Sequence, residues 1–161
     1  MIGDNPRPRV VFDCMVYLQA TISESGPAAA LLRLVDSQAI SLFVSNEILD
    51  EVQSVLTRPK IRRKNPALTD ERINALIIRL AETATLIGEV QQHFHYERDP
   101  KDEKYINLAI EVGAEYLVSR DNDLLDLMKG KSEESRKFQE RFKSLKVIDP
   151  VEFLSIVNPK K

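Results

Sequence analysis

The segment RDPKDEKYINLAIEVGAEYLVSRDNDLL, residues 98–125, decides the fold that we predict for this chain. Apolar side chains recur at helical spacing after Asp102, and the pattern ends at Gly113, a residue type that commonly terminates helices. Tyr116, Leu117 and Val118 then form a short apolar run, which is typical of an interior strand. This strand ends in the acidic turn SRDND. A helix followed by a buried strand indicates a parallel sheet.

The acidic residues of this segment are expected to meet at one edge of that sheet. In open parallel sheets, ligands bind outside the carboxyl ends of the strands. Asp121 and Asp123 follow the strand directly. Asp102 stands at a helix start, and helix starts face the same edge in βαβ units. The sequence therefore predicts that these carboxylates share a site.

The rest of the chain repeats the alternation of helix and strand. We predict α/β architecture in a single domain, residues 1–161, because five short strands alternate with helices along the whole chain. The other four strands are expected at 9–12, 41–44, 85–87 and 145–148. Helices are expected at 16–22 and 27–35, after the cap residues Ser45, Thr69 and Asp149, and within the highly charged segment 129–143 around Phe138 and Phe142.

Composition excludes several classes of protein. A chain of 161 residues with 43% hydrophobic content is long enough to bury a core without disulfides, and its one cysteine cannot form a disulfide framework. No stretch approaches the roughly 18 apolar residues of a membrane span, and no secretory signal begins the chain. We therefore expect a cytoplasmic protein without a membrane segment.

Net charge at first argues against a polyanionic partner. The formal charge is -2, whereas nucleic-acid binders are usually basic. If five of the 25 acidic residues converge and hold metal, 20 remain against 23 lysines and arginines. The rest of the surface would then be mildly basic.

Two further acids complete a candidate constellation. Asp13 ends the first expected strand, and Glu47 lies in the first turn of the helix after the second. Each acid alone is more simply explained as a helix cap or turn residue. Together, at least four carboxylates at one edge would repel each other unless a cation were present. Carboxylates combined with water and phosphate oxygens suit Mg²⁺ or Mn²⁺.

Four stretches carry a resemblance to a known family: VVFD, SNEILDEV, the segment 98–125, and DPVEFL. Together they resemble the PIN domain, and in particular the toxin-like PIN proteins of bacterial toxin-antitoxin systems. The similarity extends over nearly the whole chain, and the segment 98–125 is its most specific part. It implies a three-layer fold with a five-stranded parallel sheet in which the first and fourth strands are adjacent.

The resemblance also implies a function and its residues. It implies a metal-dependent ribonuclease with a cognate antitoxin and frequent homodimers. Carried over by position, it implies metal-binding and catalytic acids at Asp13, Glu47, Asp102 and Asp121. The neighbouring acid is Asp123, which we count among the metal ligands. The hydroxyl beside these acids is that of Ser119, which we count among the substrate-binding residues.

The stretch RPKIRRKNP, residues 58–66, is a candidate for RNA contact. It carries five cations and contains two prolines that disfavour a helix, so we predict an exposed basic loop. Arg62, Arg63 and Lys64 would bind phosphates there, although a merely solvated surface is the commoner role of such loops.

One position departs from the family pattern. Members usually carry Asn or another polar residue two positions after the first Asp, whereas this chain has Met15. A thioether can neither donate to phosphate nor hold a metal-bound water. A catalytically weak RNA-binding or protein-interaction module is therefore the alternative. A phosphoryl-accepting domain is a third reading, but a phosphatase of that kind would need a second Asp where Met15 stands.

Other residues have weaker cases. His93 and His95 could share a metal, but no third ligand lies nearby, which disfavours a site. Cys14 stands beside an acid, which raises a thiol pKa and argues against a nucleophile. Glu51 lies one helical turn after Glu47, and we favour a solvated position for it over one in the site.

Overall fold

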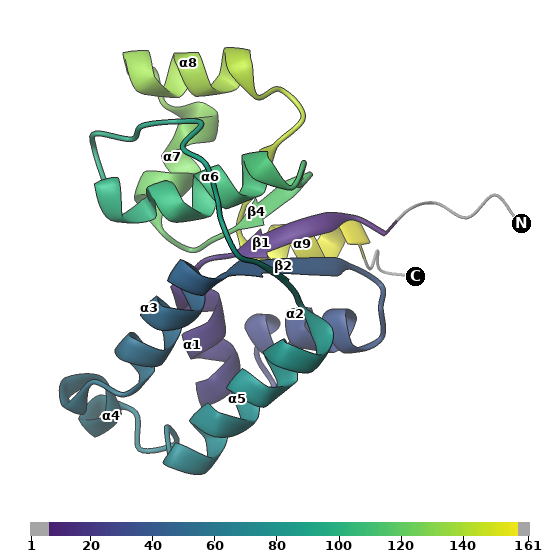
Figure 1. The fold of residues 1–161 in the computed structure, drawn as a ribbon, viewed down its shortest axis with the longest axis vertical. Coiled ribbons are helices and arrows are strands. Elements are labelled where there is room, and N and C mark those ends of the chain that lie inside the picture. The colour runs from purple at the N-terminus through teal and green to yellow at the C-terminus, as the bar shows by residue number, and fades with distance from the viewer. Residues whose placement is uncertain (1–6, 158–161) are drawn as a thin grey trace, which may run out of the picture.

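The sheet has five strands, and all of them run parallel. Figure 1 presents the computed structural model, which describes residues 7–157. The strand order is β3-β2-β1-β4-β5, so β1 is central and β4 is its neighbour. The predicted α/β fold with a five-stranded parallel sheet is confirmed. The strands are β1 (Arg9–Phe12), β2 (Ser41–Ser45), β3 (Thr85–Ile87), β4 (Tyr116–Val118) and β5 (Lys146–Ile148).

Helices cover both faces of this sheet (Figure 1). One face carries α1 (Cys14–Ile22), α2 (Pro27–Asp36), α3 (Asn46–Leu56) and α5 (Asp70–Thr83), with α4 (Pro59–Lys64) beyond α3. The other face carries α6 (Glu103–Glu111), α7 (Asn122–Lys129) and α8 (Glu133–Arg141). A short 3₁₀ turn, η1 (Pro100–Asp102), precedes α6, and the closing helix α9 (Pro150–Val157) contacts α2.

Strand register brings distant residues to one edge. Phe12 pairs with Val118, and Val118 pairs with Ile148. The ladder continues past the strand ends, because the Asp13 N–H donates to the Val118 carbonyl (3.1 Å) and the Ser119 N–H to the Ile148 carbonyl (2.9 Å). Asp13 and Ser119 therefore leave the sheet side by side.

The helix starts follow the predicted capping residues. The Ser45 hydroxyl accepts the Ile48 N–H (3.1 Å), and the Asp149 carboxylate accepts the Glu152 N–H (2.8 Å). The Thr69 hydroxyl caps α5 in the same way. Each bond satisfies an N–H that the first helical turn leaves free. After α6, Gly113 takes a positive φ of 64°, which glycine adopts without strain.

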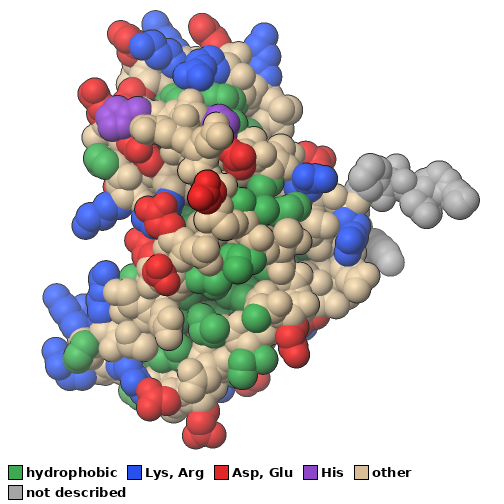
Figure 2. Space-filling model, viewed as in Figure 1, with side chains coloured by type: hydrophobic (Ala, Val, Ile, Leu, Met, Phe, Trp, Pro, Cys, Tyr) green, Lys and Arg blue, Asp and Glu red, His purple; other side chains and the backbone are tan. Residues whose placement is uncertain are grey.

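The predicted basic loop at 58–66 is wrong, because residues 59–64 form α4. Pro59 occupies the first helical turn, where its missing N–H is not needed. Pro66 lies beyond the helix end, so it bounds the helix rather than breaking it. Figure 2 shows cations gathered over α4 at the lower left.

The charged segment after α7 forms the expected helix, α8, and packs on the core through aromatic side chains. Phe138 of α8 is fully buried, and its ring packs edge to face against that of Phe94, with 5.5 Å between the ring centroids. Phe142 packs against the same ring at 6.0 Å. These contacts hold residues 88–99, the connection between β3 and η1, against the helices of that face.

Candidate active site

Asp13 is held by two donors at the end of β1. Its side chain is 3% exposed, and its Oδ1 accepts the Val16 N–H (3.1 Å) at the start of α1. Its Oδ2 accepts the hydroxyl of Ser119. Burial raises the pKa of Asp13 to about 6, although both hydrogen bonds oppose this rise. The two hydrogen bonds therefore fix the orientation of the carboxylate, but they do not offset the cost of burying its negative charge.

Asp102 carries a buried oxygen without a partner. The residue is 9% exposed, and its Oδ2 accepts no hydrogen bond. Burial, followed by the charges of Asp121 and Asp99, raises its pKa to about 8. A buried acceptor without a donor costs stability, and a bound cation would satisfy it. This atom and the surrounding carboxylates fit a hard divalent ion.

A three-acid group lies beside Asp102. One carboxylate oxygen from each of Asp99, Asp121 and Asp123 lies within 4.8 Å of the others. The Asp121 Oδ1 accepts the Asp123 N–H (2.7 Å), and the Asp121 N–H donates to the Ser119 hydroxyl (2.8 Å). The sequence reasoning missed Asp99, although it stands only three residues before Asp102 in the same acidic run.

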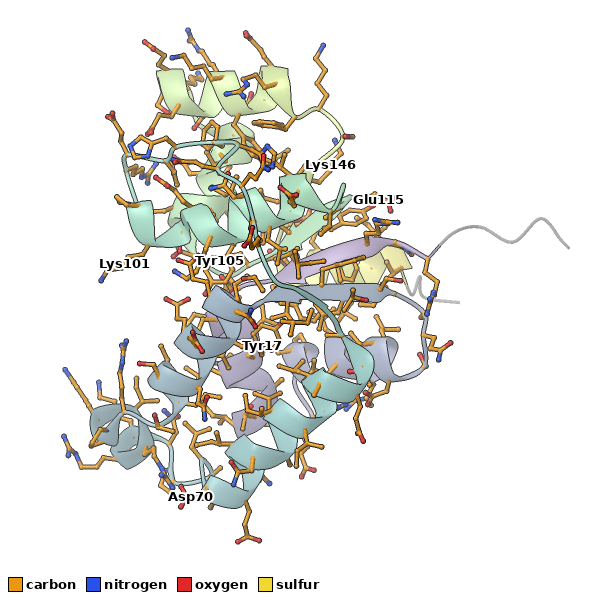
Figure 3. The ribbon with its side chains drawn as sticks, in the orientation of Figure 1. Tyr17, Asp70, Lys101, Tyr105, Glu115 and Lys146 are labelled. Atoms are coloured by element: carbon orange, nitrogen blue, oxygen red, sulfur yellow. The ribbon has the colours of Figure 1, made fainter. Side chains whose placement is uncertain are left out.

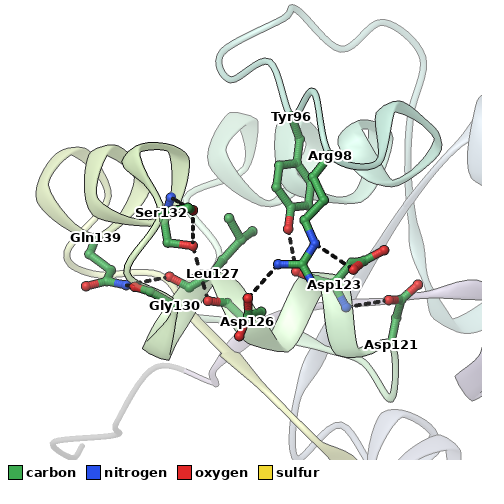
Figure 4. A network of polar contacts seen from close by, with 10 residues as sticks. Tyr96, Arg98, Asp121, Asp123, Asp126, Leu127, Gly130, Ser132 and Gln139 are labelled. Carbon is green, nitrogen blue, oxygen red and sulfur yellow. Dashed lines mark hydrogen bonds and ion pairs between the residues drawn. The ribbon is translucent and has the colours of Figure 1, made fainter.

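Arg98 already compensates one acid of this group. Its Nε lies 2.8 Å from Asp123 Oδ1, and its Nη1 lies 2.5 Å from Asp126 Oδ2 (Figure 4). The Tyr96 hydroxyl donates to the Asp123 carbonyl (2.6 Å) and holds the same turn. Within residues 7–157, Asp99, Asp102 and Asp121 have no such ion pair, so no basic side chain compensates these carboxyl groups when they ionise.

The structure separates the two glutamates of α3. Glu47 is exposed and borders a surface hollow with Gln91 and Asn107, outside the three-acid group. Its catalytic role stays a prediction. Glu51 accepts the hydroxyl of Tyr105 and lies 3.3 Å from the Lys104 ammonium. The solvated position that we favoured for Glu51 is therefore wrong.

Tyr105 links Glu51 to the start of α1. It projects from α6 toward α3 (Figure 3), and its hydroxyl oxygen accepts the Cys14 N–H (3.2 Å). Burial raises the pKa of Cys14 to about 12, and the charges of Glu51 and Asp13 add to this rise. Glu51 thus shares an electrostatic environment with Asp13, and Cys14 stays a protonated thiol, as the sequence indicated.

Only part of the predicted basic trio is available to a ligand. Arg62 pairs with Asp70 (2.7 Å) and donates from Nε to the Leu68 carbonyl (2.9 Å), so it closes the turn after α4. Arg63 and Lys64 are exposed and form no ion pair within the described residues. Their contact with RNA stays a prediction.

The two histidines attach the 88–99 connection to α6. His93 Nε2 lies 2.6 Å from Glu111, and His95 Nδ1 lies 2.6 Å from Glu103.

Met15, two residues after Asp13, is 41% exposed in the first turn of α1. Among residues 7–157, no helix combines the length and apolar character needed to cross a membrane.

Comparison with known proteins identifies the family of this chain. The model of the PIN domain family matches residues 9–123, which include Asp13, both glutamates of α3 and the three-acid group. An uncharacterized protein of Methanocaldococcus jannaschii is 29% identical over 146 residues, which are 91% of this chain and 89% of that protein. PIN domains are usually nucleases and generally depend on divalent metal. Since the matched segment spans most of the chain and the sheet has the expected topology, this protein belongs to the PIN domain family.

Proposed function

We propose that this protein is a Mg²⁺- or Mn²⁺-dependent endoribonuclease that hydrolyses RNA phosphodiester bonds. The observation that carries the proposal is the buried, partnerless Oδ2 of Asp102 beside three further carboxylates. If the residue at this position served only to stabilise the fold, an apolar side chain would give a more stable protein than a buried carboxyl group. The buried carboxyl group is more simply explained as a metal ligand.

The acids of the site would have different roles, which depend on their positions. Asp13, Asp102 and Asp121 would hold the ion, with Asp99 and Asp123 completing the set. When bound, such an ion stabilises negative charge on phosphate oxygens and lowers the pKa of a water nucleophile. Ser119 orients Asp13 and the main chain of Asp121 at once. Glu51, held by Tyr105, would add a carboxylate next to Asp13, and Glu47 would act at the rim.

The wider biological role rests on the resemblance to toxin-like PIN proteins. We propose that residues 1–161 act as a single domain, as a homodimer in the cytoplasm, and as the toxin of a toxin-antitoxin pair. A cognate antitoxin would then be encoded by a small adjacent reading frame. Overexpression of this chain should arrest growth, and co-expression of that neighbour should restore it. Growth that is unaffected by overexpression would remove the toxin role without touching the nuclease proposal.

Cleavage assays test the nuclease itself. RNA and DNA of the same sequence are incubated with the protein in Mn²⁺ and in EDTA. We expect RNA cleavage only with metal, and its loss in Asp102→Asn. Asp50→Asn is the matched control, since Asp50 is exposed on the same helix as Glu51. Cleavage that persists in EDTA, or equal activity in both variants, would contradict the proposal.

Met15 supports one alternative, a catalytically weak RNA-binding or protein-interaction module. Its side chain is partly exposed two residues from Asp13, where a polar group could orient water. RNA binding without measurable metal-dependent turnover would favour this second function.

A further inference from the structure

A cavity of about 390 Å³ lies at the carboxyl edge of the sheet, and Arg120, the residue before Asp121, is part of its lining. Four segments converge on it: the end of α1, the start of α2, the turn from β4 into α7, and the start of α9. Its volume falls in the range of ordinary small-ligand sites. The site described above does not use this space.

Arg120 connects the cavity to the candidate active site. It lines the cavity and stands between Ser119 and Asp121, so its Cα is about 3.8 Å from each of theirs. Its backbone N–H is also among the groups that lower the pKa of Asp13. Its side chain is exposed and forms no ion pair or hydrogen bond within residues 7–157, in contrast to Arg98. A free guanidinium at this point is suited to bind phosphate with two N–H groups.

The cavity walls suit a nucleobase. Pro27, Leu125 and Val151 offer apolar surface for the faces of a ring. Gln19 offers a donor and an acceptor for its edge. Asp149 adds a carboxylate, one oxygen of which caps α9 while the other can accept a hydrogen bond. Carboxylates pair with exocyclic amino groups of bases, which uracil lacks.

We propose that this cavity binds one nucleotide of the RNA strand next to the scissile phosphate, and that it prefers adenine, cytosine or guanine to uracil. Arg120 holds the phosphate, the apolar walls hold the ring, and Asp149 accepts the amino group. This inference rests on the proposed nuclease function for its biological meaning. Its binding chemistry can be measured independently of cleavage.

The first test is binding in EDTA, where the metal site plays no part. The four nucleoside 5′-monophosphates are titrated into isotope-labelled protein, and amide shifts are followed by NMR. We expect shifts at Gln19 and Arg120, with UMP weakest, and on the order of tenfold weaker binding in Arg120→Ala. Asp149→Ser keeps a good helix cap and should remove the preference against UMP. Equal binding of all four nucleotides in the wild-type protein, or no binding, overturns the proposal.

The second test blocks the cavity. Val151 is 65% exposed, so Val151→Trp can enlarge the side chain without overpacking the core. Ile156→Trp, at a 48% exposed position of the same helix and outside the cavity, is the matched control. The chain contains no other tryptophan, so blue-shifted emission in Val151→Trp verifies that the ring fills the cavity.

Cut sites in a random RNA pool then separate the two proposals. We expect a base preference beside the cut in wild type and Ile156→Trp, and its loss in Val151→Trp, with Mn²⁺ binding unchanged in all three. If wild type cleaves with a preference that Val151→Trp retains, the subsite is refuted while the nuclease stands. If wild type does not cleave at all, the nuclease proposal fails, and the binding experiment in EDTA still decides the subsite.

Discussion

Metal binding by this protein should depend steeply on pH, because the ion must displace protons from buried acids. Without metal, the pKa of Asp102 is about 8 and that of Asp13 about 6, both raised chiefly by burial. Metal ligands bind in their deprotonated form, so binding releases these protons. The perturbation is a change of pH between 6 and 9 during titration with Mn²⁺.

The magnitude follows from the pKa of Asp102. At pH 7, about nine in ten Asp102 side chains are protonated, so each bound Mn²⁺ should release about 0.9 proton from this group. At pH 9 the release should fall to about 0.1. When the pH falls from 7 to 6, protonation of Asp102 should therefore raise the apparent Kd about tenfold, and protonation of Asp13 should raise it about a further twofold. The apparent Kd should level off above pH 8.

Stability without metal should change in the opposite sense. Between the ordinary carboxyl pKa near 4 and a value of about 8, the folded protein binds more protons than the unfolded chain. Its free energy of unfolding is then largest at the acidic end of this window and decreases as pH rises through it. Mn²⁺ should therefore raise Tm more at pH 8 than at pH 6.

Isothermal titration calorimetry measures both quantities. Titrations at one pH in two buffers with different ionisation enthalpies give the number of protons released. Asp50→Asn should behave as wild type, whereas Asp102→Asn should bind weakly and release far fewer protons. A Kd for Mn²⁺ that stays constant from pH 6 to 8, with no proton release, would refute the assignment of Asp102 as a buried ligand.

Three further predictions concern other parts of the chain. Phe138→Ala should reduce the free energy of unfolding by about 3–5 kcal/mol, measured by urea denaturation, because it empties a fully buried site; a loss below about 1 kcal/mol would mean that α8 does not anchor the core. Replacing Arg63 and Lys64 together by Ala should reduce the slope of log affinity against log salt by about 1.4 for single-stranded RNA, and an unchanged slope would assign both side chains to solvent. Met15→Asn should raise metal-dependent cleavage at nearly unchanged metal affinity, and a flat or lower rate would make Met15 a packing residue.

Local features of the sequence were sufficient to predict most of the fold. Strands at β1 and β4, the caps Ser45 and Asp149, and the end of α6 at Gly113 all agree with the structure. Each of these depends on interactions within a few residues, such as a capping hydrogen bond or a positive φ. The adjacency of β1 and β4 came from the family resemblance, and it places Asp13 beside Ser119.

The composition of the candidate site depended on contacts between residues far apart in the chain. Asp99 joins the acids because His93 and His95 attach its aperiodic segment to α6, and no local pattern predicts such a path. Glu51 differs from Glu47 through its contacts with Lys104 and Tyr105 of α6, and Tyr105 is 54 residues away in sequence. Helical periodicity places two residues on one face of a helix, but the partner packed against that face decides which of them is buried.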